Sequence, residues 1–174
     1  RTRERYDVIT LEPPDIFTAG VVNLYTEDFY RQAAAALNDG GLFVQWIPIG
    51  EMPEREMRML TRAFLNVFPE TTIWLEQPRA AVPILLVGSK QRQTIDVAAL
   101  TRRMRVDPVR RDLVRLGFPE PAQLLDHFVA GTTRVAQWVA DAPSVTDDQT
   151  FVDFSTPKQL YSGFGFGSMR LRGK

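Results

Sequence analysis

The sequence contains no cysteine and a single histidine, His127. Without cysteine, disulfides, thiolate metal ligands and cysteine nucleophiles are all excluded. One histidine excludes a cluster of histidine metal ligands, and a Ser-His-Asp triad would have to use His127. We expect His127 to serve packing or to face solvent, on an apolar helix beside Phe128 and Val129.

Long hydrophobic runs are missing as well. The longest, over 80–88, has nine residues and contains Pro83, whereas a membrane-spanning helix needs about 20 residues. The first five residues lack the apolar core of a signal peptide. We therefore expect a cytoplasmic protein, either on its own or as the cytoplasmic domain of a membrane-fused parent.

Neither sign of charge is in excess, because 21 basic side chains balance 21 acidic ones. A formal charge of +0 argues against a general nucleic-acid binder, which needs a positive surface to attract phosphates. The length of 174 residues suits one ordinary domain. A composition of 44% hydrophobic and 24% charged residues is typical of a globular chain and excludes a wholly disordered one.

The first half of the chain alternates between strand and helix patterns. Residues 6–12 form a short β-branched run that stops at two prolines, which is typical of a parallel strand buried on both faces. Thr26 then opens a helix with two carboxylates in its first turn, and Gly40 and Gly41 are expected to end it. A second helix is expected to begin at Pro53. Further strands are predicted over 42–46, 71–76 and 82–88, the last two as an antiparallel hairpin.

This order, β-α-β-α-β-β, predicts an α/β fold with an antiparallel strand at one end of the sheet. We divide the chain into a partial α/β sheet over 1–90, a helical annex packed on it over 91–160, and a flexible tail over 161–174. The annex is expected to hold three short helices, which begin at Asp107, Pro121 and Thr133.

The strand over 6–12 has the composition of a central strand, yet only five residues precede it. In an open sheet, one edge of this apolar strand would be bare, which natural proteins avoid. Either another copy or chain covers that edge, or the sequence is the second half of a longer protein whose N-terminal half covers it. We favour the longer protein.

Candidate functional residues follow the first two strands. Ligands of open α/β sheets bind at the carboxyl ends of the parallel strands, and here those ends are Glu12 to Asp15 and Gln45 to Pro48. Glu12 and Asp15 would place two carboxylates at the mouth of a cleft, with Trp46 as an aromatic wall. Such carboxylates can bind a cation or take a proton from an amine. Solvated loop carboxylates that only end a strand are the simpler alternative.

Three segments carry a family resemblance: YDVITLEPPD over 6–15, GVVNLYTEDFY over 20–30 and LNDGGLFVQW over 37–46. They resemble the spermidine synthase (polyamine aminopropyltransferase) family, whose pattern has a YDVI strand, an acidic DxxDP loop, an LFTEEFY helix start and a GGxxxQ strand. A fourth segment, VTDDQTFVDF over 145–154, is similar to the TDDxPxLEF segment of divergent, often membrane-fused, bacterial members.

The resemblance implies the C-terminal half of a methyltransferase-like Rossmann sheet. It implies transfer of an aminopropyl group to a polyamine, with decarboxylated S-adenosylmethionine as co-substrate, and neither a tightly bound cofactor nor a metal. The family acid that takes the proton of the amine falls on Glu12, and the acid that helps hold the substrates falls on Asp15. A family glutamine falls on Gln45, and we expect both Gln45 and Trp46 to contact substrate.

The sequence departs from the family at several points. Glu12 is one methylene longer than the family aspartate, Ile16 replaces the loop proline, and the tyrosine of a polyamine-binding TYPSG segment is missing from 75–79. The nucleotide loop and ribose-binding acid of the family lie in a preceding half, so we expect no activity from this chain alone. Two alternatives stay open: a non-catalytic module that dimerises or binds a partner through its sheet edge, and, less favoured, an S-adenosylmethionine-dependent methyltransferase.

Overall fold

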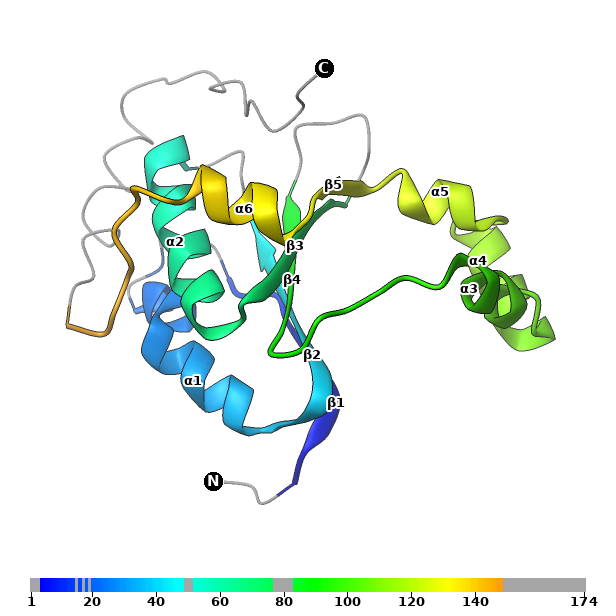
Figure 1. The fold of residues 1–174 in the computed structure, drawn as a ribbon, viewed down its shortest axis with the longest axis horizontal. Coiled ribbons are helices and arrows are strands. Elements are labelled where there is room, and N and C mark those ends of the chain that lie inside the picture. The colour runs from blue at the N-terminus through cyan, green and yellow to red at the C-terminus, as the bar shows by residue number, and fades with distance from the viewer. Residues whose placement is uncertain are drawn as a thin grey trace.

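The structure is a computed structural model, which describes residues 4–14, 16, 18, 20–48, 52–76 and 83–148. A five-stranded sheet in the order β1-β2-β4-β3-β5 forms its centre (Figure 1). The strands are Tyr6–Leu11 (β1), Leu37–Ile47 (β2), Glu70–Leu75 (β3), Ile84–Ser89 (β4) and Phe128–Ala130 (β5). The helices are Glu27–Ala35 (α1), Glu54–Val67 (α2), Val97–Met104 (α3), Asp107–Arg115 (α4), Pro121–Leu125 (α5) and Thr132–Trp138 (α6), and the short 3-10 helix Val21–Tyr25 (η1) precedes α1.

The mixed α/β class predicted from the sequence is confirmed. β1 and β2 are parallel, and the chain between them forms α1. β3 and β4 pair in antiparallel fashion, as the hairpin prediction requires, and β4 inserts between β3 and β2. Among the described strands, β1 and β2 are therefore the only parallel pair, and the carboxyl-terminal edge of the sheet is where they end.

Gly40 and Gly41 do not end α1, as the sequence predicted, but lie inside β2. The helix stops at Ala35, and β2 begins at Leu37. Gly40 takes a φ of +73°, which L side chains rarely adopt, and the register with β1 slips at this point. The two glycines therefore form an irregularity within a strand, where sequence alone suggested a helix end.

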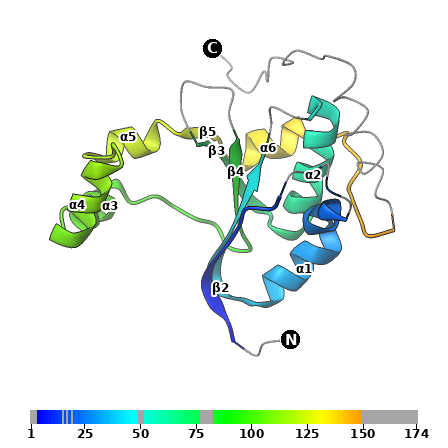
Figure 2. The ribbon, with the colours of Figure 1, turned by 180° about the vertical axis from the view of Figure 1, so that it is seen from behind.

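One face of the sheet is covered by α1, α2 and α6 (Figure 1; Figure 2 from behind). An aromatic cluster fills the space beneath α1 and α2. Phe43 of β2 stacks on Phe68 with ring centroids 5.4 Å apart, and Tyr30 meets Phe64 edge to face at 5.0 Å. All four rings are fully buried. Gly88 of β4 lies under them, and its missing side chain leaves the room that the rings occupy.

On the opposite face of the sheet, no helix formed by the described residues packs directly (Figures 1 and 2). Residues on this face alternate with fully buried ones along β2, β3 and β4, and each is only partly buried. We call them the open face: Leu42, Val44, Trp46, Thr72, Trp74, Leu85 and Val87. The sheet thus buries one face fully, whereas a sheet with helices on both sides would bury two.

β1 is the edge strand and is more exposed than the sequence predicted. A strand buried on both faces was expected, whereas four of its residues are exposed and Val8 keeps 53% of its accessible surface. The reason is that among the described residues only β2 pairs with β1 and nothing covers its open-face side. The bare edge that the sequence analysis anticipated is present.

The annex differs from its prediction in several elements. α4 and α5 begin at the predicted residues Asp107 and Pro121, and α6 begins one residue before the predicted Thr133. α3 and β5 were not predicted. His127 lies on no helix; it precedes β5, and its Nδ1 is 2.8 Å from the carbonyl oxygen of Leu75.

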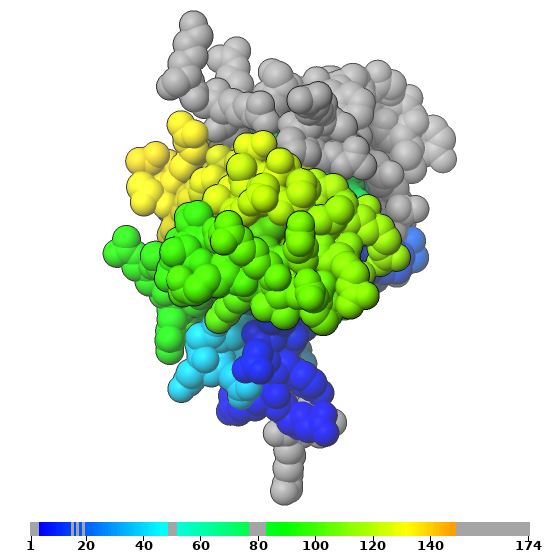
Figure 3. Space-filling view, turned by 90° about the vertical axis from the view of Figure 1, so that its right-hand side faces the viewer, coloured from blue at the N-terminus to red at the C-terminus, as the bar shows by residue number. Residues whose placement is uncertain are grey.

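The helices of the annex fall into two groups. α6 packs on α2 and β3, whereas α3, α4 and α5 pack on one another and stand over the open face (Figures 1 and 3). No helix within the described ranges is long and apolar enough to cross a membrane. The predicted tail over 161–174 lies outside the described residues.

Gly88→Ala should destabilise the fold by about 1–3 kcal/mol, because the added methyl group overpacks the aromatic cluster. An added Cβ would lie 2.4 Å from Cε1 of Phe64 and 2.7 Å from Cβ of Phe68. Urea denaturation measures the loss. Gly131→Ala is the matched control, since its Cβ would meet nothing nearer than 3.6 Å; equal stability of the two variants would contradict the packing described.

Tyr30→Phe should reduce the stability that the fold loses at alkaline pH. Burial raises the pKa of the Tyr30 hydroxyl well above its ordinary value of 10.0, and neighbouring Tyr25 raises it further. Above pH 10 the unfolded state releases the Tyr30 proton, whereas the folded state keeps it. The stability that Tyr30 contributes to the fold is therefore intact below pH 10 and is lost as the pH rises beyond it.

Denaturation at pH 9 and pH 11 tests this. Between those values the wild type should lose about 1 kcal/mol more stability than Tyr30→Phe. Tyr6→Phe, which removes a hydroxyl from the exposed edge strand, is the control. Identical losses for wild type and Tyr30→Phe would show that this hydroxyl does not drive the alkaline transition.

Candidate functional site

β1 brings the first candidate carboxylate to the carboxyl-terminal edge of the sheet. Glu12 directly follows Leu11, the last residue of β1, and is exposed. Pro13 and Ile16, which follow Glu12 in the chain, are both buried. Asp15, the second predicted carboxylate, lies outside the described residues.

Gln45 and Trp46, the candidates on β2, lie on opposite faces of the sheet. Gln45 pairs with Leu11 and is fully buried on the helix-covered side. Its Nε2 donates to the Trp46 carbonyl oxygen at 3.3 Å, and its Oε1 has no hydrogen-bond partner among the described residues. Trp46 belongs to the open face. If the alternation of β1 continued one residue past Leu11, Glu12 would face the same side of the sheet as Trp46, opposite Gln45.

Two groups at this edge offer chemistry: the exposed carboxylate of Glu12 and the partly buried indole of Trp46. A carboxylate can accept a proton from an ammonium group or attract a cation, and the face of an indole also attracts cations. Within the described part of the chain, no group of three or more His, Cys, Asp or Glu side chains could hold a metal ion. The arrangement of Glu12 and Trp46 suits a cationic amine.

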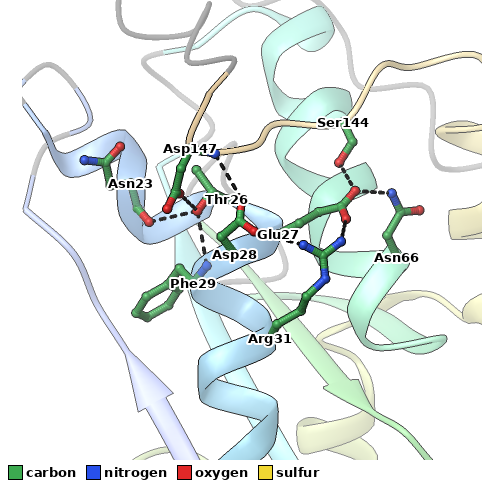
Figure 4. A network of polar contacts seen from close by, with 9 residues as sticks. All are labelled: Asn23, Thr26, Glu27, Asp28, Phe29, Arg31, Asn66, Ser144 and Asp147. Carbon is green, nitrogen blue, oxygen red and sulfur yellow. Dashed lines mark hydrogen bonds and ion pairs between the residues drawn. The ribbon is translucent and has the colours of Figure 1, made fainter. Parts of the chain in front are cut away.

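A polar network ties the start of α1 to residues 144–148, more than a hundred positions further along the chain (Figure 4). Its centre is Glu27, which is buried in the first turn of α1. Glu27 accepts hydrogen bonds from Asn66 of α2 and from Ser144, and it forms an ion pair with Arg31. A charge buried in this way is stable because every one of these partners donates to it.

Thr26 and Asp28 hold the same segment on either side of Glu27 (Figure 4). Thr26 caps α1 by accepting from the Phe29 N–H at 3.2 Å, and its hydroxyl donates to Asp147 Oδ1 at 2.6 Å. Asp28 Oδ2 accepts from the Asp147 N–H at 3.1 Å. These contacts fix the point at which the fourth segment of the family resemblance, 145–154, begins.

Sequence reasoning did not predict this network. It interpreted Glu27 and Asp28 only as first-turn carboxylates that favour a helix N-terminus. Asn66 and Ser144 gave no signal, because their role depends on packing between distant elements. The one available signal was that the TEDFY and TDD segments resemble the same family, which could have suggested that the two meet.

Comparison with known proteins points to one relationship, although no family model matches the chain. Over 111 residues, 59% of this chain, the sequence is 29% identical to the polyamine aminopropyltransferase of Ruegeria sp. (strain TM1040). The fold is similar to the crystal structure of a probable spermidine synthase from Corynebacterium glutamicum ATCC 13032, with a TM-score of 0.51, 18% identity and 81% of this chain covered. The chain is spermidine synthase-like.

Both spermidine synthase-like relatives are longer than this chain. The matches cover 37% of the Ruegeria protein and 47% of the Corynebacterium chain, so the chain spans less than half the length of either. The resemblance stated from the sequence motifs is confirmed, and so is the fold class. Activity and the roles of single residues are not fixed by this similarity.

Glu27→Gln should destabilise the fold by about 1–3 kcal/mol, because it removes a buried charged acceptor and leaves its donors poorly satisfied. Chemical denaturation measures the loss. Asp112→Asn is the control: Asp112 pairs with Arg115 at 3.5 Å, but both side chains are largely exposed, so little change is expected. If the two variants were equally stable, Glu27 would not anchor the 144–148 segment.

Proposed function

We propose that the chain is the C-terminal half of a spermidine synthase-like transferase, which moves an aminopropyl group from decarboxylated S-adenosylmethionine to a polyamine. The observation that carries the proposal is Glu12: an exposed carboxylate directly after the carboxyl end of parallel β1, in a chain similar to a polyamine aminopropyltransferase. The amine acceptor is a small molecule, and decarboxylated S-adenosylmethionine is a co-substrate rather than a tightly bound cofactor.

The proposed reaction is a displacement at carbon. The amine nitrogen forms a bond to the aminopropyl carbon next to the sulfonium, and the carbon–sulfur bond breaks with its electron pair going to sulfur. Methylthioadenosine leaves without help from an acid, because sulfur becomes neutral. The amine arrives protonated at neutral pH and cannot attack until its proton is taken, and we assign that step to Glu12.

The other predicted residues take supporting roles in this proposal. Asp15 holds the charged substrates, and Trp46 provides an aromatic wall against a cationic amine. Gln45 is buried on the helix-covered side of β2, so its role is to hold the end of the strand in place. Its Oε1, which has no hydrogen-bond partner among the described residues, could accept a hydrogen bond from a group of the complete enzyme.

We propose that the enzyme needs an N-terminal half that associates through the free edge of β1. Two observations support this: the relatives are at least twice as long as the stretch they share with this chain, and β1 has an exposed edge. The same edge supports the second candidate, a non-catalytic module that dimerises or binds a partner through β1. The two differ in whether the completed protein transfers aminopropyl groups.

Glu12→Gln in the longer polypeptide that contains both halves should lower kcat by about a hundredfold or more, because the amide cannot accept the proton of the amine. The assay follows methylthioadenosine release from decarboxylated S-adenosylmethionine and a polyamine. Asp39→Asn, an exposed carboxylate near the start of β2, is the control and should keep the wild-type rate. Transfer by Glu12→Gln at the wild-type rate would remove Glu12 from the mechanism.

A further inference from the structure

Residues 144–147, which we call the strap, are held to the start of α1 by main-chain as well as side-chain bonds (Figure 4). The Glu27 N–H donates to the Val145 carbonyl oxygen at 3.0 Å, and the Asp147 N–H donates to Asp28. Val145 is fully buried, whereas Asp147 is exposed. The strap is therefore part of the packed fold, although Asp147 itself reaches solvent.

The strap binds the chain at one end of the segment that begins with Glu12. Glu12 directly follows β1, and the next element among the described residues is η1. Thr26, whose hydroxyl donates to Asp147, directly follows η1 and caps α1. Pairing of β1 with β2 thus holds one end of the segment between β1 and η1, and the strap is bonded to the other end.

A path of hydrogen bonds leads from the strap to the start of η1. The Thr26 hydroxyl donates to Asp147 Oδ1 at 2.6 Å and lies 3.2 Å from the Asn23 carbonyl oxygen inside η1. The Asn23 N–H donates to the carbonyl oxygen of Gly20, which enters η1 with a φ of +81°. Glycine adopts such a turn at little cost. Thr26 and Asn23 therefore connect Asp147 to the turn at which the segment after Glu12 enters η1.

Charged groups are a poor choice if the only task is to hold the strap in place. Arg31 pairs with both Glu27 and Asp28, and Glu27 is buried. Buried ion pairs add little net stability, because the loss of hydration offsets their attraction, and apolar side chains of similar volume would often serve as well. Hydrogen bonds to charged groups differ from apolar contacts in that they fix a direction as well as a distance. The composition of the network therefore suits positioning.

We infer that the strap positions the segment that begins with Glu12, and that Asp147 is a positioning residue for the proposed aminopropyl transfer. Asp147 acts through Thr26 and η1 and does not touch the substrates. This rests on the proposed function, because Glu12 is the base assigned there. It adds a contribution from the C-terminal end of the described chain to a site at the end of β1. Such positioning matters because a displacement of about 1 Å can cost on the order of a hundredfold in rate.

A purely structural strap is the competing explanation. In that case Asp147 would only hold the strap against α1, and its loss would lower the stability of the fold without changing the turnover of the molecules that remain folded. The two explanations differ in the order of η1 and in kcat per folded molecule. Asp147 suits the test because it is exposed, so its replacement leaves the buried core untouched.

Amide hydrogen exchange on the 174-residue chain tests the link between the strap and η1. Asp147→Ala should speed the exchange of the η1 amides severalfold and leave those of β4 unchanged. Asp147→Asn keeps an oxygen that can accept from Thr26 and should stay close to the wild type. Asp141→Ala is the matched control, since this exposed carboxylate pairs with Arg58 of α2 rather than with α1. Unchanged exchange of η1 in Asp147→Ala would overturn the inference.

Kinetics in the longer polypeptide that contains both halves test the role of Asp147 in transfer. Asp147→Ala should lower kcat about tenfold, because the base is displaced while the rest of the strap still binds. KM for the amine should stay within about twofold, since ground-state binding is not changed. Asp147→Asn should recover most of the loss, and Asp141→Ala should match the wild type. Circular dichroism gives the folded fraction by which each rate is divided.

Two kinetic results would overturn the role of Asp147 in transfer. One is a kcat per folded molecule of Asp147→Ala equal to that of the wild type, which would leave the strap a structural part only. The other is the absence of transfer by the wild type, which would remove the proposed function and the positioning role with it. The exchange experiment separates these failures, because it shows whether the strap orders η1 regardless of any activity.

Discussion

The packing of Phe43, Phe64 and Phe68 against Gly88 decides which face of the sheet is buried. Side chains alternate along a strand, so the placement of Phe43 on the helix-covered side sends Leu42 and Val44 to the other. Because β4 pairs in register with both β2 and β3, the same division between buried and open sides extends across the sheet to β3. A large apolar surface is the consequence, because the strands are apolar on both faces while the described helices α1, α2 and α6 cover only one.

The candidate site follows from the same alternation. At the carboxyl end of the parallel pair, Gln45 falls on the buried side and Trp46 on the open side, and the exposed Glu12 directly follows the end of β1. The polar network around Glu27 lies at the start of α1, against α2, where it fixes the segment that leads into 145–154. The carboxyl-terminal edge of the parallel pair thus lies between the helix-covered face and the open face of the sheet.

Much of the fold was predictable, since runs of β-branched residues and helix caps report local structure that tertiary packing leaves unchanged. The order of the first six elements and the hairpin follow from such signals. Gly40 and Gly41 misled the prediction because glycine serves a strand irregularity as readily as a helix end. β5 could not be found, because it has three residues and exists through pairing with β3. The exposure of β1 depends on what lies next to it, which its own composition does not report.

Amide hydrogen exchange on the 174-residue chain tests the central claim most directly, that the described sheet has a free edge at β1. β4 lies between two hydrogen-bonded neighbours, whereas β1 has one. The amides of β4 should exchange most slowly, and the outward-facing amides of β1 should exchange almost as fast as those of an unfolded peptide. Protection of all β1 amides to the level of β4 in a monomeric sample would contradict the account.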